Sequence, residues 1–190
     1  QSGFHVFYTM DHKNVVTLNA MMKALNMSEE ISKSLPLLYQ SVRRDIKPDN
    51  TTFVCALEAC GKNAHLKDGH TIHTAIIENQ SEQDLIVANA LIDMYAKCSL
   101  HGEAQCVFDK LVVQDEVSWN AMMAGYAQHG RGYEALNCFQ EMLCEGHSPN
   151  SVTLLCVLIA CSRSGLLEEA QMIFGDMTER YGISPGIDHH

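Results

Sequence analysis

The chain has 190 residues, 46% hydrophobic and 19% charged, which is enough for one or two domains or a short run of repeats and excludes compositional disorder. A formal net charge of −10 excludes polyanion binding by bulk electrostatics, because such binding needs many cationic contacts to phosphate. Apolar stretches end after about ten residues, so no membrane span is expected. The first residues carry no signal-peptide pattern and no initiator Met, which suggests a fragment or a processed product.

An internal repeat organises the sequence. The segment VTLNAMM at residues 16–22 returns 101 residues later as VSWNAMM, at residues 117–123, and a shorter echo, VANALI, lies at residues 87–92. Self-similarity at a regular spacing is typical of repeat architectures.

The three asparagines of these segments set the register of the repeats. Counting four residues back from each Asn gives the start of a unit, and the units are 35, 35, 31, 35 and 36 residues long. Residues 1–14 match the tail of a preceding short unit, and residues 187–190, which end in a His pair, are either the start of a next unit or part of a tag. The predicted units are residues 15–49, 50–84, 85–115, 116–150 and 151–186.

Each unit is predicted to form two helices. In residues 116–150, apolar residues recur at helical spacing before a polar break at residues 128–132 and again after it. No segment alternates apolar and polar residues over strand length, so we predict an all-α fold of about ten helices, a right-handed α-solenoid of helix–turn–helix repeats. Pro36 falls inside an expected second helix, where proline costs about 3 kcal/mol or more, and this predicts a late helix start or a kink. Trp119, which aligns with Leu18, is predicted to be structural.

These segments resemble the pentatricopeptide repeat proteins, specifically the plant-type PLS subclass, and the resemblance covers essentially the whole chain. It rests on VSWNAM, NALIDMYAKC and LIACSRSGL, and the YGISP near the end resembles the close of that family's last long repeat. By this resemblance, the chain comes from near the C-terminal end of a repeat array. Its P-type repeats are residues 15–49 and 116–150, its L-type repeats 50–84 and 151–186, and its S-type repeat 85–115.

The resemblance implies a single-stranded RNA binder that reads one base per repeat through the fifth and last residues of each unit. An Asn carboxamide carries donors and an acceptor, so it can pair with the Watson–Crick edge of an unstacked base. By the same resemblance, Asn with Asp favours uracil, Asn with Asn favours a pyrimidine, and the amino end lies toward the 5′ side of the RNA. The implied reading pairs are Asn19 with Asp49, Asn89 with Asp115, and Asn120 with Asn150.

The two L-type units are expected to discriminate poorly. Their fifth and last residues are Val54 with Asp84 and Leu155 with Gly186. Neither apolar side chain can hydrogen-bond to a base. The expected register is therefore 5′-U-n-U-Y-n-3′.

Two further sets of residues are assigned by the resemblance. The second residue of a unit would wedge between bases and replace their stacking, with core packing as the alternative. Cations late in the first helices could contact phosphate, with solvated surface as the alternative. The base-sandwiching candidates are Val16, Ile86, Val117 and Val152, with Thr51 in the weaker unit, and the phosphate candidates are Lys62, Lys97 and Arg163.

Neither a metal nor a cofactor is expected. The eight cysteines contain no Cys-x-x-Cys, and the closest pairs, Cys55/Cys60 and Cys156/Cys161, are five residues apart. All the thiols are interpreted as small buried hydrophobes in a reducing compartment. A group formed by His65, His70 and His73 suggests zinc, but no Cys or carboxylate is placed to complete a tetrahedron.

These features bear on three candidate functions. The favoured one is the RNA-recognition module of an organelle RNA-editing (C-to-U) or RNA-processing factor, in chloroplast or mitochondrion by resemblance alone. The alternative is a helical scaffold for protein–protein interaction, in which each reading Asn would be only a helix cap or a polar solvent position. An enzyme is not expected, because no nucleophile–base set or deaminase signature is present, and any deaminase domain would lie beyond this chain. Protein partners of an editing complex, and self-association through apolar ends near Phe4, Phe7, Ile173 and Phe174, are further expectations.

Overall fold

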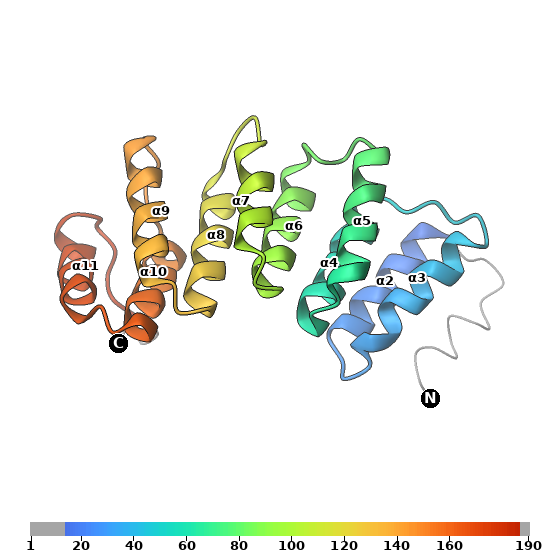
Figure 1. Ribbon diagram of the computed structural model, residues 1–190, viewed down its shortest axis with the longest axis horizontal. Coiled ribbons are helices and arrows are strands. Elements are labelled where there is room, and N and C mark those ends of the chain that lie inside the picture. Colours follow the sequence, from blue (N-terminus) through green and yellow to red (C-terminus); the bar gives the residue numbers. More distant parts are fainter. Residues whose placement is uncertain (1–13, 187–190) are drawn as a thin grey trace. The chain divides into compact units, whose positions relative to one another are not determined.

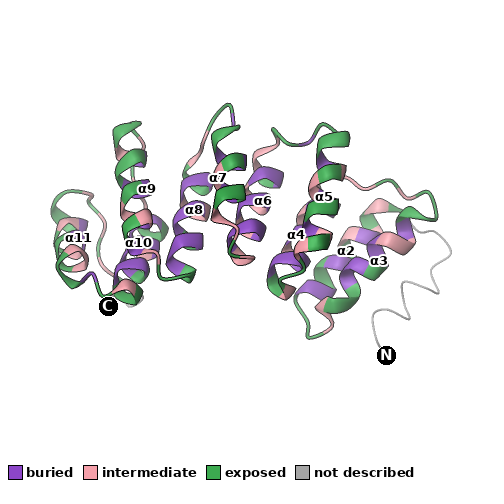
Figure 2. Ribbon diagram, in the orientation of Figure 1, coloured by how far each residue is buried: buried purple, intermediate pink, exposed green. Residues whose placement is uncertain are grey.

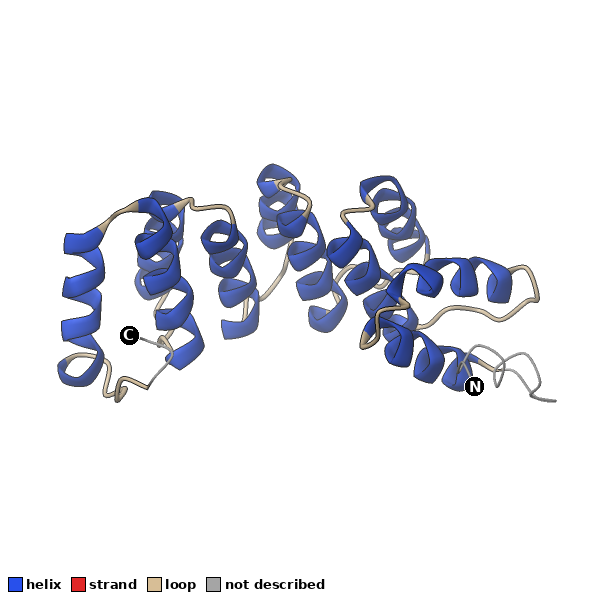
Figure 3. Cartoon of the chain, turned by 90° about the horizontal axis from the view of Figure 1, so that it is seen from below, coloured by secondary structure: helices blue, strands red, loops and turns tan. Residues whose placement is uncertain are grey.

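The computed structural model describes residues 14–186, and all regular secondary structure in that range is helical (Figure 1, Figure 3). Phe4, Phe7 and the terminal His pair lie outside the described residues. The chain divides into two compact units, residues 1–98 and 99–190. No helix within residues 14–186 is long and apolar enough to cross a membrane.

In the first unit, the first helices of successive repeats pack side by side. Helix α4 packs against both α2 and α6, while α3 packs on α2 and α4, and α5 packs on α4 and α6. A 3₁₀ turn, η1, precedes α3. The elements are α2 (Val15–Asn26), η1 (Ile31–Lys33), α3 (Ser34–Val42), α4 (Asn50–Asn63), α5 (Leu66–Glu78) and α6 (Leu85–Lys97).

The second unit repeats this arrangement. Helix α10 packs on α8, α9 packs on both of them, α7 packs on α8, and α11 packs on α10. The elements are α7 (His101–Asp109), α8 (Glu116–Gln128), α9 (Gly132–Cys144), α10 (Ser151–Ser164) and α11 (Leu167–Glu179). Two α-helices thus lie within each of the five ranges proposed as repeats.

The apolar stripes that predicted the helices form the core of each unit. Figure 2 shows buried residues concentrated along the first helices, such as α4, α6 and α8. Leu18, Leu57 and Leu91 are fully buried in the first unit, as are Met123 and Val157 in the second. Trp119 is 2% exposed and packs edge-on against Phe108, which confirms its structural role.

Most cysteines are packing groups. Cys55, Cys60, Cys138, Cys156 and Cys161 are buried, and burial raises the pKa of the Cys60 and Cys138 thiols to about 12, which keeps them neutral. The prediction that all the thiols are buried is wrong for three residues. Cys106 and Cys144 are exposed, and Cys98 is half-buried.

Pro36 lies in the first turn of α3. The 3₁₀ turn delays the start of this helix to Ser34, so α3 has 9 residues where α5 has 13. In the first turn a backbone N–H has no intrahelical partner, so proline costs no hydrogen bond there. The late start predicted from the sequence is confirmed.

Candidate nucleic-acid interface

Asn19, the fifth residue of α2, is bound at both ends of its side-chain amide. Its Nδ2 donates to Asp49 Oδ1 at 2.9 Å and to Oδ2 at 3.2 Å. Its Oδ1 accepts from the Thr52 hydroxyl at 2.6 Å. Because a carboxylate only accepts and the hydroxyl donates here, one orientation of the amide satisfies both neighbours.

Asp49 is at the same time the N-cap of α4. Its Oδ1 accepts from the backbone N–H of Thr52 at 2.8 Å, and the Thr52 hydroxyl accepts from the backbone N–H of Asp49, which completes a capping box. Partial burial would raise the pKa of Asp49, but the hydrogen bonds from Thr52 and Asn19 outweigh burial and lower the pKa below its usual value. The side chain is therefore ionised at neutral pH.

The pair Asn120 and Asn150 repeats this geometry in the second unit. Asn120 Nδ2 donates to Asn150 Oδ1 at 3.4 Å, and Asn120 Oδ1 accepts from the Thr153 hydroxyl at 2.7 Å. Asn150 caps α10 by accepting the backbone N–H of Thr153 at 3.0 Å, which turns its Nδ2 outward toward Glu116 Oε2 at 3.4 Å. Where Asp49 presents a second acceptor oxygen, Asn150 therefore presents a donor.

The third predicted pair, Asn89 and Asp115, belongs to one predicted repeat but is divided between the two compact units. Asn89 is the fifth residue of α6 in the first unit. Asp115 caps α8 in the second unit, where its Oδ1 accepts from the Ser118 backbone and hydroxyl, each at 2.8 Å. Each residue holds the same local place as its counterparts, and their pairing stays a prediction.

The fifth-position asparagines are not helix caps. Asn19, Asn89 and Asn120 each lie inside a first helix, whereas the residue that closes the preceding unit caps it. The helix-cap alternative is therefore wrong for these three asparagines.

The range 50–84, predicted to be an L-type unit, has a different polar contact at this place. Val54 is the fifth residue of α4, and Asp84, which caps α6, accepts from Asn50 Nδ2 at 2.8 Å. Ser81 in turn donates to Asn50 Oδ1 at 2.7 Å. Asn50 is the first residue of its unit, and sequence reasoning missed it because no other unit begins with Asn. In the range 151–186, also predicted to be L-type, Leu155 lies on α10 and Gly186 ends the described residues.

The second-position side chains are exposed although they are apolar. Val16 and Asn19 are three residues apart on α2, so they share a face of that helix. The core alternative is wrong for this set, whose exposed fractions are 69% for Val16, 71% for Ile86, 58% for Val117 and 51% for Val152. Thr51 is exposed as well.

The candidate phosphate contacts already have protein partners. Lys62 donates to the backbone carbonyl of Asn26, the last residue of α2, at 3.0 Å and pairs with Glu58. Arg163 donates to the backbone carbonyl of Gln128, the last residue of α8, at 2.9 Å. Both cations thus neutralise the C-terminal end of the preceding first helix, a role the sequence did not reveal. Lys97 pairs with Asp93 on its own helix.

Two of the three histidines noted in the sequence, His70 and His73, contact a tyrosine. The Tyr95 hydroxyl lies 2.7 Å from His73 Nδ1 and 3.3 Å from His70 Nδ1. Among residues 14–186, no group of three or more His, Cys, Asp or Glu side chains is arranged to hold a metal ion.

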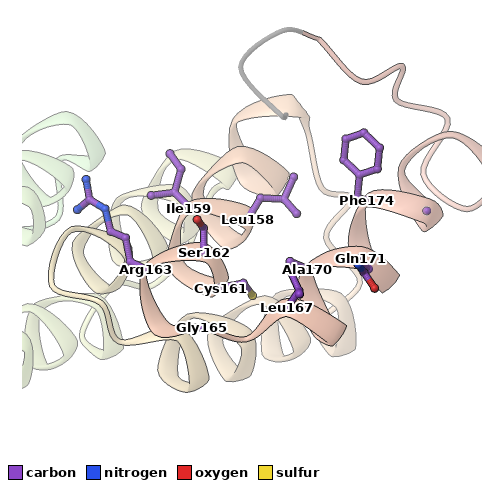
Figure 4. A pocket seen from close by; sticks show the side chains of 11 residues that line it. Leu158, Ile159, Cys161, Ser162, Arg163, Gly165, Leu167, Ala170, Gln171 and Phe174 are labelled. Atoms are coloured by element: carbon purple, nitrogen blue, oxygen red, sulfur yellow. The ribbon is translucent and has the colours of Figure 1, made fainter.

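A groove of about 630 Å³ lies between α10 and α11 (Figure 4). Leu158, Leu167 and Phe174 supply apolar side chains to its wall, and Arg163 lies at one end. The expectation that Ile173 is exposed near the end of the chain is wrong, because this residue is 6% exposed and packs inward. Phe174 is half-buried.

Comparisons with protein families match repeat models along the second half of the chain. A model described as PPR repeat matches residues 86–115 and 152–181, and one described as PPR repeat family matches residues 114–163. The matched models describe a repeat rather than a catalytic domain.

Pentatricopeptide repeat-containing proteins of Arabidopsis thaliana are similar along most of the chain. One is 37% identical over 190 residues, covering 100% of this chain and 24% of the relative. Another is 40% identical over 181 residues, covering 94% of this chain and 21% of the relative. The chloroplastic CRR2 is 37% identical over 188 residues, covering 98% of this chain and 29% of the relative. The chain therefore spans about a quarter of the length of these relatives.

Solved structures share the fold. The crystal structure of PPR10 in complex with an 18-nt psaJ RNA element matches with a TM-score of 0.82 at 17% identity, covering 98% of this chain and 28% of that one. The structure of PPR10 from maize matches with a TM-score of 0.74 at 22% identity, covering 94% and 26%. The fold is thus an α-solenoid of helix–turn–helix repeats. Given this fold, the repeat models and the relatives along the chain, the protein belongs to the pentatricopeptide repeat family.

Proposed function

We propose that the chain binds single-stranded RNA, one base per repeat, as part of the recognition module of a plant organelle RNA-editing (C-to-U) or RNA-processing factor. One observation carries the proposal. A fifth-position Asn is hydrogen-bonded to the last residue of its unit in both Asn19–Asp49 and Asn120–Asn150, 30 residues apart each time. The PPR10 complex with an RNA element and the chloroplastic relatives support the same reading.

The chemistry of the pair Asn19–Asp49 fits uracil. Both bonds from Asn19 Nδ2 go to one carboxylate, so the two oxygens can share one amide hydrogen. The second hydrogen of Nδ2 can then donate to a uracil carbonyl. The ionised Asp49 can accept from the uracil N3–H. Cytosine has an acceptor at N3, and an ionised carboxylate has no hydrogen to donate to it, so Asp49 disfavours cytosine.

The chemistry of Asn120–Asn150 tolerates cytosine. Because the cap fixes Asn150 Oδ1 toward α10, its Nδ2 is the group on the outer side. This donor can meet the N3 acceptor of cytosine. With Asn89 and Asp115 read like the first pair, the proposed register is 5′-U-n-U-Y-n-3′.

The exposed second-position residues would hold the bases apart. Val16 precedes Asn19 by three residues and Val117 precedes Asn120 by three, so each apolar side chain lies beside a reading amide. Base contact with such a platform is worth about 1–3 kcal/mol per base when the side chain is aromatic. An aliphatic wedge is expected to contribute at the low end.

Binding is expected to depend on these contacts rather than on net charge. The chain carries a net charge of −10, and Lys62, Lys97 and Arg163 are engaged within the protein. Phosphate contacts from these three would be few, so the dependence of affinity on salt would be shallow.

The test is fluorescence anisotropy at low salt with short RNAs. One RNA carries 5′-U-n-U-Y-n-3′, and others carry a purine at each read position in turn. We expect a preference of about tenfold, or 1.4 kcal/mol, that disappears at one position in Asn120→Ala. Asn137→Ala, an exposed Asn on the second helix of the same repeat, is the matched control and should keep the preference. Equal binding of all RNAs by the unmodified chain would overturn base reading and favour the scaffold for protein partners.

A further inference from the structure

A buried hydroxyl contacts each reading asparagine whose pair falls within one of the two compact units, 1–98 and 99–190. The Thr52 hydroxyl is 2.6 Å from Asn19 Oδ1, and the Thr153 hydroxyl is 2.7 Å from Asn120 Oδ1. Both threonines are the third residue of the next repeat's first helix, and both are 0% exposed. Each reading amide is therefore held by two successive repeats.

The hydroxyl helps to decide which end of the amide points where, because it donates to the amide oxygen while the last residue of the unit accepts from the amide nitrogen. The effect should be larger at Asn120, because without the hydroxyl its amide would be held only by the 3.4 Å contact from Nδ2 to Asn150 Oδ1 and could rotate by half a turn with little change in shape. A rotated amide would offer a base the wrong pattern of donors and acceptors. We propose that Thr52 and Thr153 are positioning residues that fix this orientation and so set base selectivity. This inference rests on the proposed RNA-binding function.

The sequence contains its own internal comparison. A hydroxyl residue follows every unit that has Asn at its fifth position, since Thr52 follows Asn19, Ser118 follows Asn89 and Thr153 follows Asn120. After the unit whose fifth residue is Val54, the equivalent position is Val87. The hydroxyl is present where there is an amide to orient and absent where there is none.

Helix capping alone does not account for this pattern. Thr52 and Thr153 do complete capping boxes with Asp49 and Asn150. Thr17, however, forms the same box with Asn14, and its hydroxyl donates to the Asn14 backbone carbonyl at 2.9 Å. Asp84 caps α6 with Val87 at the equivalent position, so a cap forms without the hydroxyl.

Thr17 supplies a matched control for the experiment. Thr→Val keeps the shape of the side chain and removes the hydroxyl, so Thr153→Val and Thr17→Val both weaken a cap, but only the first releases a reading amide. Thr153→Ser restores the hydroxyl. The four proteins are compared first by circular dichroism, to establish that each is folded.

The first measurement needs no RNA. Relaxation of the side-chain ¹⁵N amide signal of Asn120 is recorded by NMR in the free protein. We expect the Asn120 amide to become more mobile in Thr153→Val, to recover in Thr153→Ser, and to stay unchanged in Thr17→Val. Unchanged mobility in Thr153→Val would overturn the positioning role, whatever the RNA results.

The second measurement is the anisotropy series described above. In Thr153→Val, discrimination at the base read by residues 116–150 should fall by about tenfold, with the other positions unaffected. Thr17→Val should keep discrimination at every position. A Thr153→Val variant that discriminates as the unmodified chain does would also overturn the inference. An unmodified chain that treats all RNAs alike would overturn the proposed function instead, and the NMR result alone would then decide whether Thr153 orients Asn120.

Discussion

Asn19 donates its side-chain amide to both carboxylate oxygens of Asp49, at 2.9 and 3.2 Å, across 30 residues of sequence. Asp49 is also the cap of the following helix, so the residue that closes one repeat opens the next. The two roles share one carboxylate. A change at this position is therefore expected to alter base choice without loss of the helix start, provided that the new side chain can still cap.

An exchange of the last residues should exchange the base preferences. Asp49→Asn should move the first read position from uracil toward cytosine, because the cap holds Oδ1 and turns Nδ2 outward, as in Asn150. Asn150→Asp should move the fourth position toward uracil. Asn and Asp cap helices almost equally well, so stability should change little.

The measurement is the ratio of dissociation constants for RNAs that carry U or C at one position. A shift of about fivefold to tenfold is expected at the altered position. The other read position serves as the control in each variant. A change in overall affinity with an unchanged ratio would count against the outward amide as the selecting group.

Much of the fold could be predicted from the sequence, because it is built from local patterns that recur. The repeated segments at residues 16–22 and 117–123 set the helix register, and Pro36 marked the one late helix. What could not be predicted were contacts between repeats. The hydrogen bonds from Lys62 to Asn26 and from Thr52 to Asn19 join residues 36 and 33 positions apart. They depend on how successive helices stack, which no local pattern encodes.

The exposed valine of α8 is expected to matter for binding and not for stability. Val117 is 58% exposed, so Val117→Ser should change the free energy of unfolding by less than about 0.5 kcal/mol. RNA affinity should fall about fivefold, as a base loses its apolar neighbour. Val157→Ala is the matched contrast, because Val157 is 0% exposed and its truncation should cost about 2 kcal/mol of stability.

Urea unfolding and anisotropy separate these two effects. Val157→Ala should bind RNA as the unmodified chain does under conditions where it is folded. A Val117→Ser variant that unfolds early would assign this residue to the core instead.

Gly132 is predicted to be intolerant of any side chain. A Cβ there would lie 2.7 Å from both Leu166 Cδ1 and Ser164 Oγ. The Ser164 hydroxyl cannot retreat easily, because it accepts from the Gly132 N–H at 2.8 Å and donates to the Gly130 carbonyl at 2.7 Å. Gly132→Ala should therefore cost about 1–3 kcal/mol, although Ala is the better helix former. Gly102→Ala on α7, where a Cβ would meet nothing within 4 Å, is the control for thermal unfolding and should not destabilise.

Acid should weaken the fold partly through Asp49. Partial burial opposes ionisation of this group, but its hydrogen bonds from Thr52 and Asn19 lower the pKa below the ordinary value of 3.8. A carboxyl whose pKa is lower in the folded state makes its full contribution to stability at pH values above its unfolded-state pKa. That contribution is lost as the pH falls from about 5 through the lowered pKa. Asp49→Asn cannot ionise, so its free energy of unfolding should fall less steeply over this range.

The comparison is made by urea unfolding at a series of pH values between neutral and strongly acidic. Glu58 and Glu134 also have lowered pKa values and remain in both proteins, so only the difference between the two curves reports on Asp49. For Glu58, burial again opposes the shift, and the bonds from Lys62 and Asn26 produce it. Parallel curves for the unmodified chain and Asp49→Asn would mean that Asp49 has the same pKa in the folded and unfolded states, and that its bonds to Asn19 and Thr52 do not favour the charged form.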